Sequence, residues 1–286
     1  MSHPLVSVIC LCYNHERFVE EAVQSVLNQT YPNIELWLVD DASTDLSREV
    51  IGGLKEKHPH IRVLLNPVNR GHCRSFNAAF WQSHGEFIID LAADDVLMPD
   101  RISKGVDDLT KAGPEYGVHF GDALYINEEG SELGRHSRRY PHASVPDGDI
   151  YKELISRYFI CPPTVMFRRK VLEALGGYDE NLHYEDFDVL VRAARQFYFR
   201  YSPDMLVKRR LTANARSRAQ FRLFSRHSLT TLAVCRKIMA MNRTEAERLA
   251  LQQRLWYEMK LNLRLMNGDV FLRLIKLFLQ NTKRKI

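Results

Sequence analysis

Four short apolar runs, each followed by a helical or polar stretch, constrain the fold of this chain more than any other feature. They are Val6–Cys12, Ile34–Val39, Ile61–Leu65 and Phe87–Leu91. Runs of this length and composition are typical of strands buried on both faces of a parallel sheet. Right-handed crossovers between such strands gather their carboxyl ends along one edge. We therefore predict an α/β protein with a mostly parallel central sheet.

Acidic residues stand directly at the ends of two of these strands. Asp40 and Asp41 end the second strand, and Asp94 and Asp95 follow the fourth. Ligands of open α/β sheets bind at the carboxyl ends of the strands. We expect both acidic pairs to meet in one crevice, together with Asn69 after the third strand.

A cation is the expected partner of the Asp94–Asp95 pair. Two carboxylates held this close repel each other, and Mg²⁺ or Mn²⁺ shared with phosphate oxygens would relieve the repulsion. The chain has neither GxGxxG in its first turn nor a GxxxxGK[ST] loop, so a bound diphosphate must be neutralised by metal or basic side chains. The simpler alternative is that Asp95 or Asp100 only caps a helix beginning near Pro99.

Polar residues also mark two earlier helix starts. Asn14 is expected to cap the helix after the first strand, and a residue of Ser43–Asp45 the helix after the second. Capping explains the latter half of this acidic cluster but leaves Asp40 and Asp41 without a structural role.

Taken in order, these segments resemble the nucleotide-binding half of family 2 glycosyltransferases with the GT-A fold. The resemblance is carried by VSVICLCYN, SVLNQTYPNIELWLVDDASTD, NRG with Asn77 beyond it, and GEFIIDLAADDVLMPDR. It continues with PPTVMFRRKVLEALGGYDENLHYEDFDVLVRAA at residues 162–194 and covers Leu5 to Arg210. It implies a Rossmann-like GT-A domain at residues 1–215, with a nucleotide-binding half at 1–101 and an acceptor half at 102–215.

The resemblance also implies the donor site. Asp41 would accept a hydrogen bond from the base of a nucleotide sugar, commonly uracil. Asp94 would contact the ribose, and Asp95 would bind the Mn²⁺ or Mg²⁺ ion that bridges the diphosphate. Tyr13 and Asn69 would complete the nucleotide-sugar-binding site.

Asp186 matches the position of the family's catalytic base. It would remove the proton of the acceptor hydroxyl as that oxygen attacks the anomeric carbon, so the sugar would be transferred with inversion. Glu185 would orient the acceptor, and Arg209 or Arg210 would contact the diphosphate. Favourable charge at a helix N-terminus is the alternative for Glu185 and Asp186, and an ordinary exposed basic loop is the alternative for the arginines.

One position departs from the family pattern. Many members have a further aspartate two residues before Asp94, where this chain has Ala92. We interpret the change as an altered ribose contact. Asp90 would share a strand face with Ala92 and is the nearest carboxylate that could substitute, although its position also suits burial against a partner.

The net charge of +5 is unevenly distributed. From Arg200 onward the chain has 20 Lys and Arg against 5 Asp and Glu, and the preceding part has 20 against 30. The basic part could meet anionic lipid or an acidic substrate, or could be a solvated face that contacts the body. Nucleic acid is not an expected partner, because no aromatic residues are interleaved with the charges.

The five cysteines show no zinc spacing and are expected to be reduced.

Residues 216–286 are predicted to form a basic helical extension, with helices at 221–242, 244–266 and 269–280. The last helix has an apolar face flanked by Arg273 and Lys276. That face would dock onto the core, pair with a second copy in a homodimer, or lie on an anionic membrane.

The leading hypothesis is an inverting, metal-dependent glycosyltransferase. It would move a sugar from a nucleoside diphosphate, most simply a UDP-sugar, to a saccharide or lipid-linked acceptor in surface-polysaccharide synthesis. The alternative is a non-catalytic nucleotide-sugar-binding or scaffold protein, for which Ala92 is the hint. The start MSHPLVSVIC has no basic leader, and no run reaches the roughly 18 apolar residues of a spanning helix. We expect a cytoplasmic protein, peripheral on the inner membrane face if its tail binds lipid.

Overall fold

The computed structural model describes residues 3–182, 185–212 and 227–284, without the side chains of Glu185 and His227. The described part forms one nine-stranded sheet in the order β3-β2-β1-β4-β8-β6-β9-β5, with β7 paired to β6. The strands are β1 (Val6–Cys12), β2 (Ile34–Asp40), β3 (Arg62–Leu65), β4 (Phe87–Ala92), β5 (Val96–Leu97), β6 (Tyr116–Ile126), β7 (Glu132–Arg135), β8 (Met166–Arg168) and β9 (Tyr198–Arg210).

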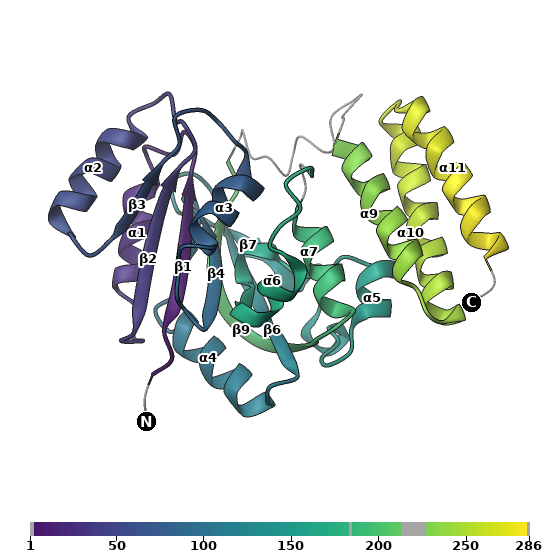
Figure 1. The fold of residues 1–286 in the computed structure, drawn as a ribbon, viewed down its shortest axis with the longest axis horizontal. Helices are drawn as coiled ribbons and strands as arrows, with labels where there is room; N and C mark the ends of the chain where they lie inside the picture. The colour runs from purple at the N-terminus through teal and green to yellow at the C-terminus, as the bar shows by residue number, and fades with distance from the viewer. Residues whose placement is uncertain (1–2, 183–184, 213–226, 285–286) are drawn as a thin grey trace.

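Helices flank this sheet and extend beyond it at one end (Figure 1). Those of the core are α1 (Val19–Leu27), α2 (Ser47–Lys57), α3 (His72–Phe80), α4 (Arg101–Ala112), α5 (Tyr151–Ser156), α6 (Arg169–Leu175) and α7 (Glu185–Ala194). The C-terminal helices are α9 (His227–Met241), α10 (Glu245–Arg264) and α11 (Gly268–Lys283).

The predicted parallel order of the first four strands is confirmed. β1 pairs in parallel with β2 and β4, and β2 pairs in parallel with β3. Every residue of β1 is buried, which explains why its sequence is apolar except for Ser7, whose hydroxyl donates to Glu35. The second half is mixed, because β8 runs antiparallel to both β4 and β6 while β9 runs parallel to β6.

The segment at residues 162–168 forms a strand over only part of its length. Pro162–Thr164 form a short 3₁₀ helix, and the strand β8 begins at Met166. Pro162 and Pro163 have no N–H group to donate to a neighbouring strand, so the sheet cannot extend through them.

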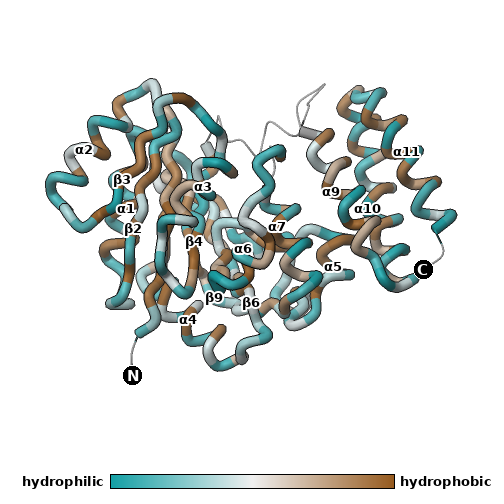
Figure 2. The backbone as a smooth tube through the Cα atoms, in the orientation of Figure 1, coloured by the Kyte–Doolittle hydropathy of each residue, from teal (hydrophilic) through white to brown (hydrophobic). Residues whose placement is uncertain are grey.

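Two apolar cores lie on opposite faces of the sheet. Val8 and Cys10 of β1 point to the face covered by α1, α2 and α4. Ile9 and Leu11 point to the other face, where α3, α5, α6 and α7 pack. The core on that second face continues into α9, α10 and α11, so the C-terminal helices share one hydrophobic core with α3, α5, α6 and α7. Figure 2 shows the corresponding hydrophobic segments along the central strands.

The three predicted C-terminal helices are present and lie side by side at the end of the molecule far from α2 (Figure 1). Residues 213–226, which include the start of the first expected helix, lie outside the described residues. Thr244 and Glu247 form a capping box at the start of α10. No helix in the described ranges is long and apolar enough to cross a bilayer.

The two loops that begin the site hold each other in place. Asn14 does not cap α1 as expected; its backbone is left-handed, with φ of 58°, and its Oδ1 accepts a bond of 2.8 Å from Thr44 N. In return, Ser43 Oγ accepts a bond from Asn14 N. Glu16 Oε2 accepts from Leu46 N at the start of α2. Asp45 acts both within α2 and between the loops, since its Oδ1 accepts a bond from Ser47 N at the start of α2, as expected of a cap, and its Oδ2 accepts one from Glu16 N. Asn14, Ser43 and Glu16 join the two loops.

Ala42 lies at the centre of these contacts with φ of 63°. A left-handed conformation is unfavourable for a residue with a Cβ atom, so Ala42→Gly should raise the free energy of unfolding by about 1 kcal/mol. Denaturant titration measures the change. Ala78→Gly inside α3 is the matched control and should lower the free energy of unfolding by about 1 kcal/mol. Destabilisation by both substitutions would contradict the strain assigned to Ala42.

Candidate active site

Asp41 is held by three N–H donors at the end of β2. Its Oδ1 accepts bonds of 2.9 Å from Asn66 Nδ2 and 2.8 Å from Arg70 N, and its Oδ2 accepts one of 2.8 Å from Gly71 N. Burial opposes the charge, but these donors outweigh it and hold the pKa of Asp41 below its ordinary value. The Ser75 hydroxyl is a further donor to this carboxylate.

The neighbouring Asp40 is structural. It is fully buried, and its Oδ1 accepts bonds from Arg48 Nε and Ser43 N. Of the two carboxylates that end β2, only Asp41 is therefore placed for a ligand.

Asp94 and Asp95 lie at the same edge, beyond the end of β4. Asp95 is 4% exposed, and its Oδ1 accepts a bond of 2.8 Å from Arg210 N on β9. It caps no helix: α4 begins after Asp100, which makes no side-chain cap bond. Burial, reinforced by Asp94, raises the pKa of Asp95 well above its ordinary value, although the arginines nearby oppose the shift.

The arginine that follows Arg209 is part of the framework. The Arg210 guanidinium donates to the carbonyl oxygens of Asp94, Asn127 and Glu128 and pairs with Glu21 on α1. These partners occupy its donors, so Arg210 fixes the Asp94–Asp95 turn rather than remaining available to a diphosphate.

Arg209 lies between the two acidic parts of the site. Its guanidinium is within electrostatic reach of both Asp95 and Asp186. Burial disfavours its charge, but the groups around it together hold its pKa above the ordinary value. Burial also raises the pKa of the neighbouring Cys161 and Tyr125 to about 12, so both are neutral at pH 7. The charges that balance Arg209 are therefore the two carboxylates.

The remaining expected site residues fall at or beside this edge. Tyr13 begins the loop after β1 with 44% of its surface exposed, and Asn69 Oδ1 accepts a bond from Gly71 N in the turn that holds Asp41. The Glu185 side chain lies outside the described residues. Its backbone and that of Asp186 begin α7.

Asp90 lies in β4 and has polar partners on α3 and after α6. Its Oδ2 contacts His72 Nε2 at 2.8 Å and accepts a bond of 3.0 Å from Tyr178 OH. The rings of His72 and Tyr178 stack with centroids 6.1 Å apart. The burial against a partner that the sequence suggested for Asp90 is confirmed.

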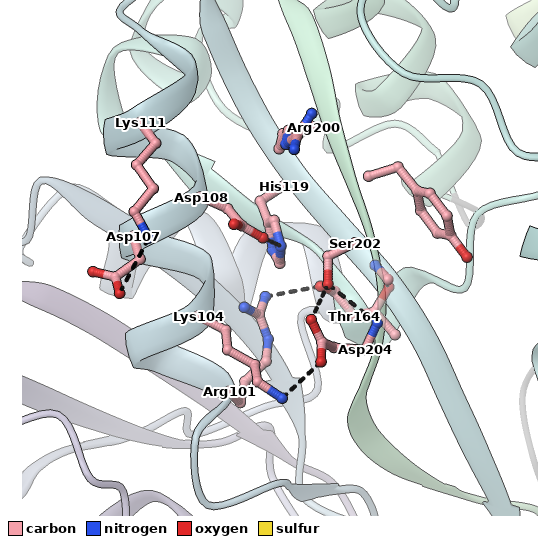
Figure 3. Close-up of polar contacts among 12 residues, drawn as sticks. Arg101, Lys104, Asp107, Asp108, Lys111, His119, Thr164, Arg200, Ser202 and Asp204 are labelled. Atoms are coloured by element: carbon pink, nitrogen blue, oxygen red, sulfur yellow. Dashed lines mark hydrogen bonds and ion pairs between the residues drawn. The ribbon is translucent and has the colours of Figure 1, made fainter.

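A second polar cluster includes Arg101, His119 and Thr164 (Figure 3). Arg101 is fully buried and donates through Nη2 to Thr164 O at 2.8 Å. Thr164 Oγ1 in turn donates to Cys161 O, which fixes the turn beneath Arg209. His119 pairs with Asp108 on the same side of the sheet, and burial lowers its pKa. This cluster holds the Cys161–Thr164 turn in place.

The residues present fit a divalent cation. No group of three metal-ligating side chains occurs among the described residues. Mg²⁺ and Mn²⁺ are commonly held by one or two carboxylates, with substrate phosphates and water completing the shell. Asp94 and Asp95 supply such a pair, and the raised pKa of Asp95 reflects negative charge that a cation would stabilise.

This arrangement of a parallel half-sheet, an acidic edge and a mixed second half is that of glycosyltransferases with the GT-A fold. The first 349 residues of S. aureus TarS in complex with UDP-GlcNAc superpose with a TM-score of 0.74 and 17% identity, over 97% of this chain and 81% of that one. The mannosyltransferase PcManGT from Pyrobaculum calidifontis, in complex with GDP-Man and Mn²⁺, gives a TM-score of 0.64 and 18% identity, over 100% and 77%.

The sequence comparisons define the family. The model of glycosyl transferase family 2 matches residues 7–176, and the chain belongs to this family. The putative glycosyltransferase EpsE of Bacillus subtilis is 30% identical over 245 residues, which are 83% of this chain and 84% of EpsE. An uncharacterized glycosyltransferase of Haemophilus influenzae is 28% identical over 189 residues, covering 65% and 70%.

Sequence reasoning missed two residues that build the site and expected another role for a third. Asn66 orients Asp41, and Cys161 lies 4.0 Å from Arg209 Nη1. Arg210 was one of two candidates for the diphosphate but fixes Asp95. Two adjacent arginines at the end of a predicted strand were a usable signal, since alternation sends them to opposite faces and hence to different partners.

Replacing Asp95 by Asn should stabilise the ligand-free protein. A carboxylate whose folded-state pKa is raised disfavours folding once the pH exceeds its unfolded value of about 3.9, and Asn keeps an acceptor for Arg210 N. We expect a higher midpoint of thermal unfolding at neutral pH. The difference should shrink as the pH falls through the folded pKa, where Asp95 becomes neutral.

The exposed Asp107 provides the control. Asp107→Asn removes the same charge from a side chain that is 66% exposed, and should change the midpoint little at any pH. A lower midpoint for Asp95→Asn at neutral pH would mean that attraction to Arg209 and Arg210 outweighs burial.

Proposed function

We propose that this chain transfers a sugar, with inversion, from a nucleoside diphosphate to a hydroxyl group of a saccharide or lipid-linked acceptor. The donor is a UDP-sugar, and Mg²⁺ or Mn²⁺ assists departure of the diphosphate. The observation that carries the proposal is the electrostatic interaction of Arg209 with both Asp95, which follows β4, and Asp186, in the first turn of α7.

The base of the donor would bind at Asp41. The lowered pKa of this carboxylate keeps it an acceptor at neutral pH. Uracil presents a ring N–H that matches such an acceptor. TarS in complex with UDP-GlcNAc, among the structural neighbours, supports a uridine donor.

The diphosphate would lie between Asp94, Asp95 and Arg209. The cation held by the two aspartates supplies electrophilic stabilisation of the leaving group. Arg209 adds a second positive charge that is already fixed by burial, so little reorganisation is needed as negative charge develops. Asp94 lies 3.9 Å from His15 Nε2 in the loop after β1, and this position supports a contact of its carboxylate with the ribose.

Asp186 would act as the general base. It begins α7, and the next carboxylate on that helix, Asp188, is buried and bonded to Arg192 and Lys237. Asp188 therefore holds the helix, while Asp186 is half-buried at its first turn and within reach of Arg209. One carboxylate that receives the proton of the attacking hydroxyl is sufficient for a single displacement.

Asp186→Asn should lower the turnover of nucleotide sugar by about 10²- to 10⁴-fold, because it removes the base and keeps the shape. Release of UDP from a panel of UDP-sugars with Mn²⁺ and saccharide acceptors measures turnover. Thermal shift by UDP should be unchanged. Asp107→Asn is the control and should keep full activity. A wild type that binds UDP-sugars without turnover on any acceptor would favour the scaffold alternative.

Arg209→Met should weaken binding of UDP by about 10-fold or more, the usual loss for a charged hydrogen bond. Arg209→Lys keeps the charge and should recover part of the affinity. Calorimetry with UDP and Mn²⁺ measures both, with the exposed Lys111→Met as a control for loss of one positive charge. Equal affinity of wild type and Arg209→Met would remove Arg209 from the diphosphate site.

A further inference from the structure

The helix α10 has an unusual distribution of polar and apolar residues. Its inner side buries Arg254 and Glu258, which pair at 2.8 Å. Its outer side exposes Leu249, Trp256 and Leu263 by 50%, 54% and 65%. These three residues are spaced by seven and therefore lie on one stripe of the helix. Apolar residues on the outer side contribute nothing to the core, so a partner outside the described chain would account for them.

The helix α11 extends this stripe. It runs antiparallel beside α10, with the rings of Trp256 and Phe278 at 6.4 Å and Gln252 Nε2 bonded to Thr282 Oγ1. Leu272 and Leu279 are 66% and 53% exposed on its outer side. Hydrophobic residues recur along the whole of both helices (Figure 2). We call the surface formed by Leu249, Trp256, Leu263, Leu272 and Leu279 the α10–α11 outer face.

Basic side chains border this face. Lys260 lies 5.1 Å from the centre of the Trp256 ring, and Lys276 and Lys283 are exposed on α11 between and beside the two leucines. A groove of about 340 Å³ between α9 and α11 is lined by Arg236, Arg273, Lys276, Leu277 and Gln280. Asp269, which pairs with Arg273, is the one acidic residue that α11 contributes.

We propose that the α10–α11 outer face binds the surface of an anionic lipid bilayer. The leucines and Trp256 enter the boundary between headgroups and acyl chains, while the lysines and the α9–α11 groove contact lipid phosphates. The helices lie on the bilayer rather than across it, because their inner sides are packed into the hydrophobic core of the protein. A second copy is a poorer occupant, because a two-fold contact would place this basic border against itself.

The orientation of the molecule follows from the fold. The α10–α11 outer face lies at the end of the molecule farthest from α2 (Figure 1). α7, which carries Asp186, packs against α9, so binding would place the acceptor half nearer the bilayer than the nucleotide-binding half. The inference goes beyond the proposed reaction, and binding to vesicles can be measured without any turnover.

Flotation of the full chain with vesicles tests the proposal. We expect binding to an equal mixture of phosphatidylcholine and phosphatidylglycerol, much weaker binding to phosphatidylcholine alone, and loss of binding at high salt. Trp256→Ser should weaken binding to the mixed vesicles about 10-fold. The double substitution Lys276→Gln and Lys283→Gln should weaken it about 25-fold and remove most of the preference for the anionic lipid.

The core provides matched controls. Trp81 at the end of α3 lies outside the α10–α11 outer face and is 55% exposed, close to the value for Trp256, so Trp81→Ser should bind like the wild type. Lys57→Gln with Lys111→Gln removes the same charge from α2 and α4 and should lower binding far less. Unfolding midpoints of all variants identify any that fail to fold, and Leu279→Ser then replaces Trp256→Ser.

Three results would overturn the proposal. They are no binding of the wild type to the anionic vesicles, equal loss in Trp81→Ser and Trp256→Ser, and a dimer in sedimentation equilibrium that Trp256→Ser dissociates. The last would assign the α10–α11 outer face to a second copy of the chain.

Discussion

The site depends on the balance of buried charge between the residues that follow β4 and those that end β9. Asp94 and Asp95 follow β4, and they would repel each other and resist burial without the two arginines that end β9. Arg210 fixes the turn through backbone and side-chain bonds, whereas Arg209 reaches toward Asp186 as well. Arg209 and Arg210 therefore link the turn after β4 to the first turn of α7.

The same logic applies to the helix that carries Asp186. Lys237 on α9 bonds to both Asp179 and Asp188, at 2.6 and 2.7 Å, and Arg254 on α10 lies 4.4 Å from the ring of Phe187. These contacts come from the C-terminal helices and hold the first turns of α7. The basic extension therefore positions the acceptor side of the site in addition to presenting its outer face.

Much of this architecture could be predicted from local pattern. The apolar runs gave four parallel strands, and the acids after them gave the sheet edge where Asp41 and Asp95 meet. Gly176 ends α6 with a left-handed backbone and Thr244 starts α10 with a capping box, and both features depend only on neighbouring residues. Contacts between distant segments could not be predicted in this way. The bond between Arg210 and Glu21 spans 189 residues, and Asn14 has its partner in another loop, 30 residues on.

Sharing of Lys237 between two carboxylates has a consequence for how this protein can vary. A chain ending at Thr212 would retain every residue assigned to donor, metal and base, yet it would leave Asp179 and Asp188 without their common ammonium group and expose the apolar side of α7. A segment that replaced the C-terminal helices would therefore have to bring a positive charge to Asp179 and Asp188 to hold α7 in the same way, whatever surface it presents to the outside.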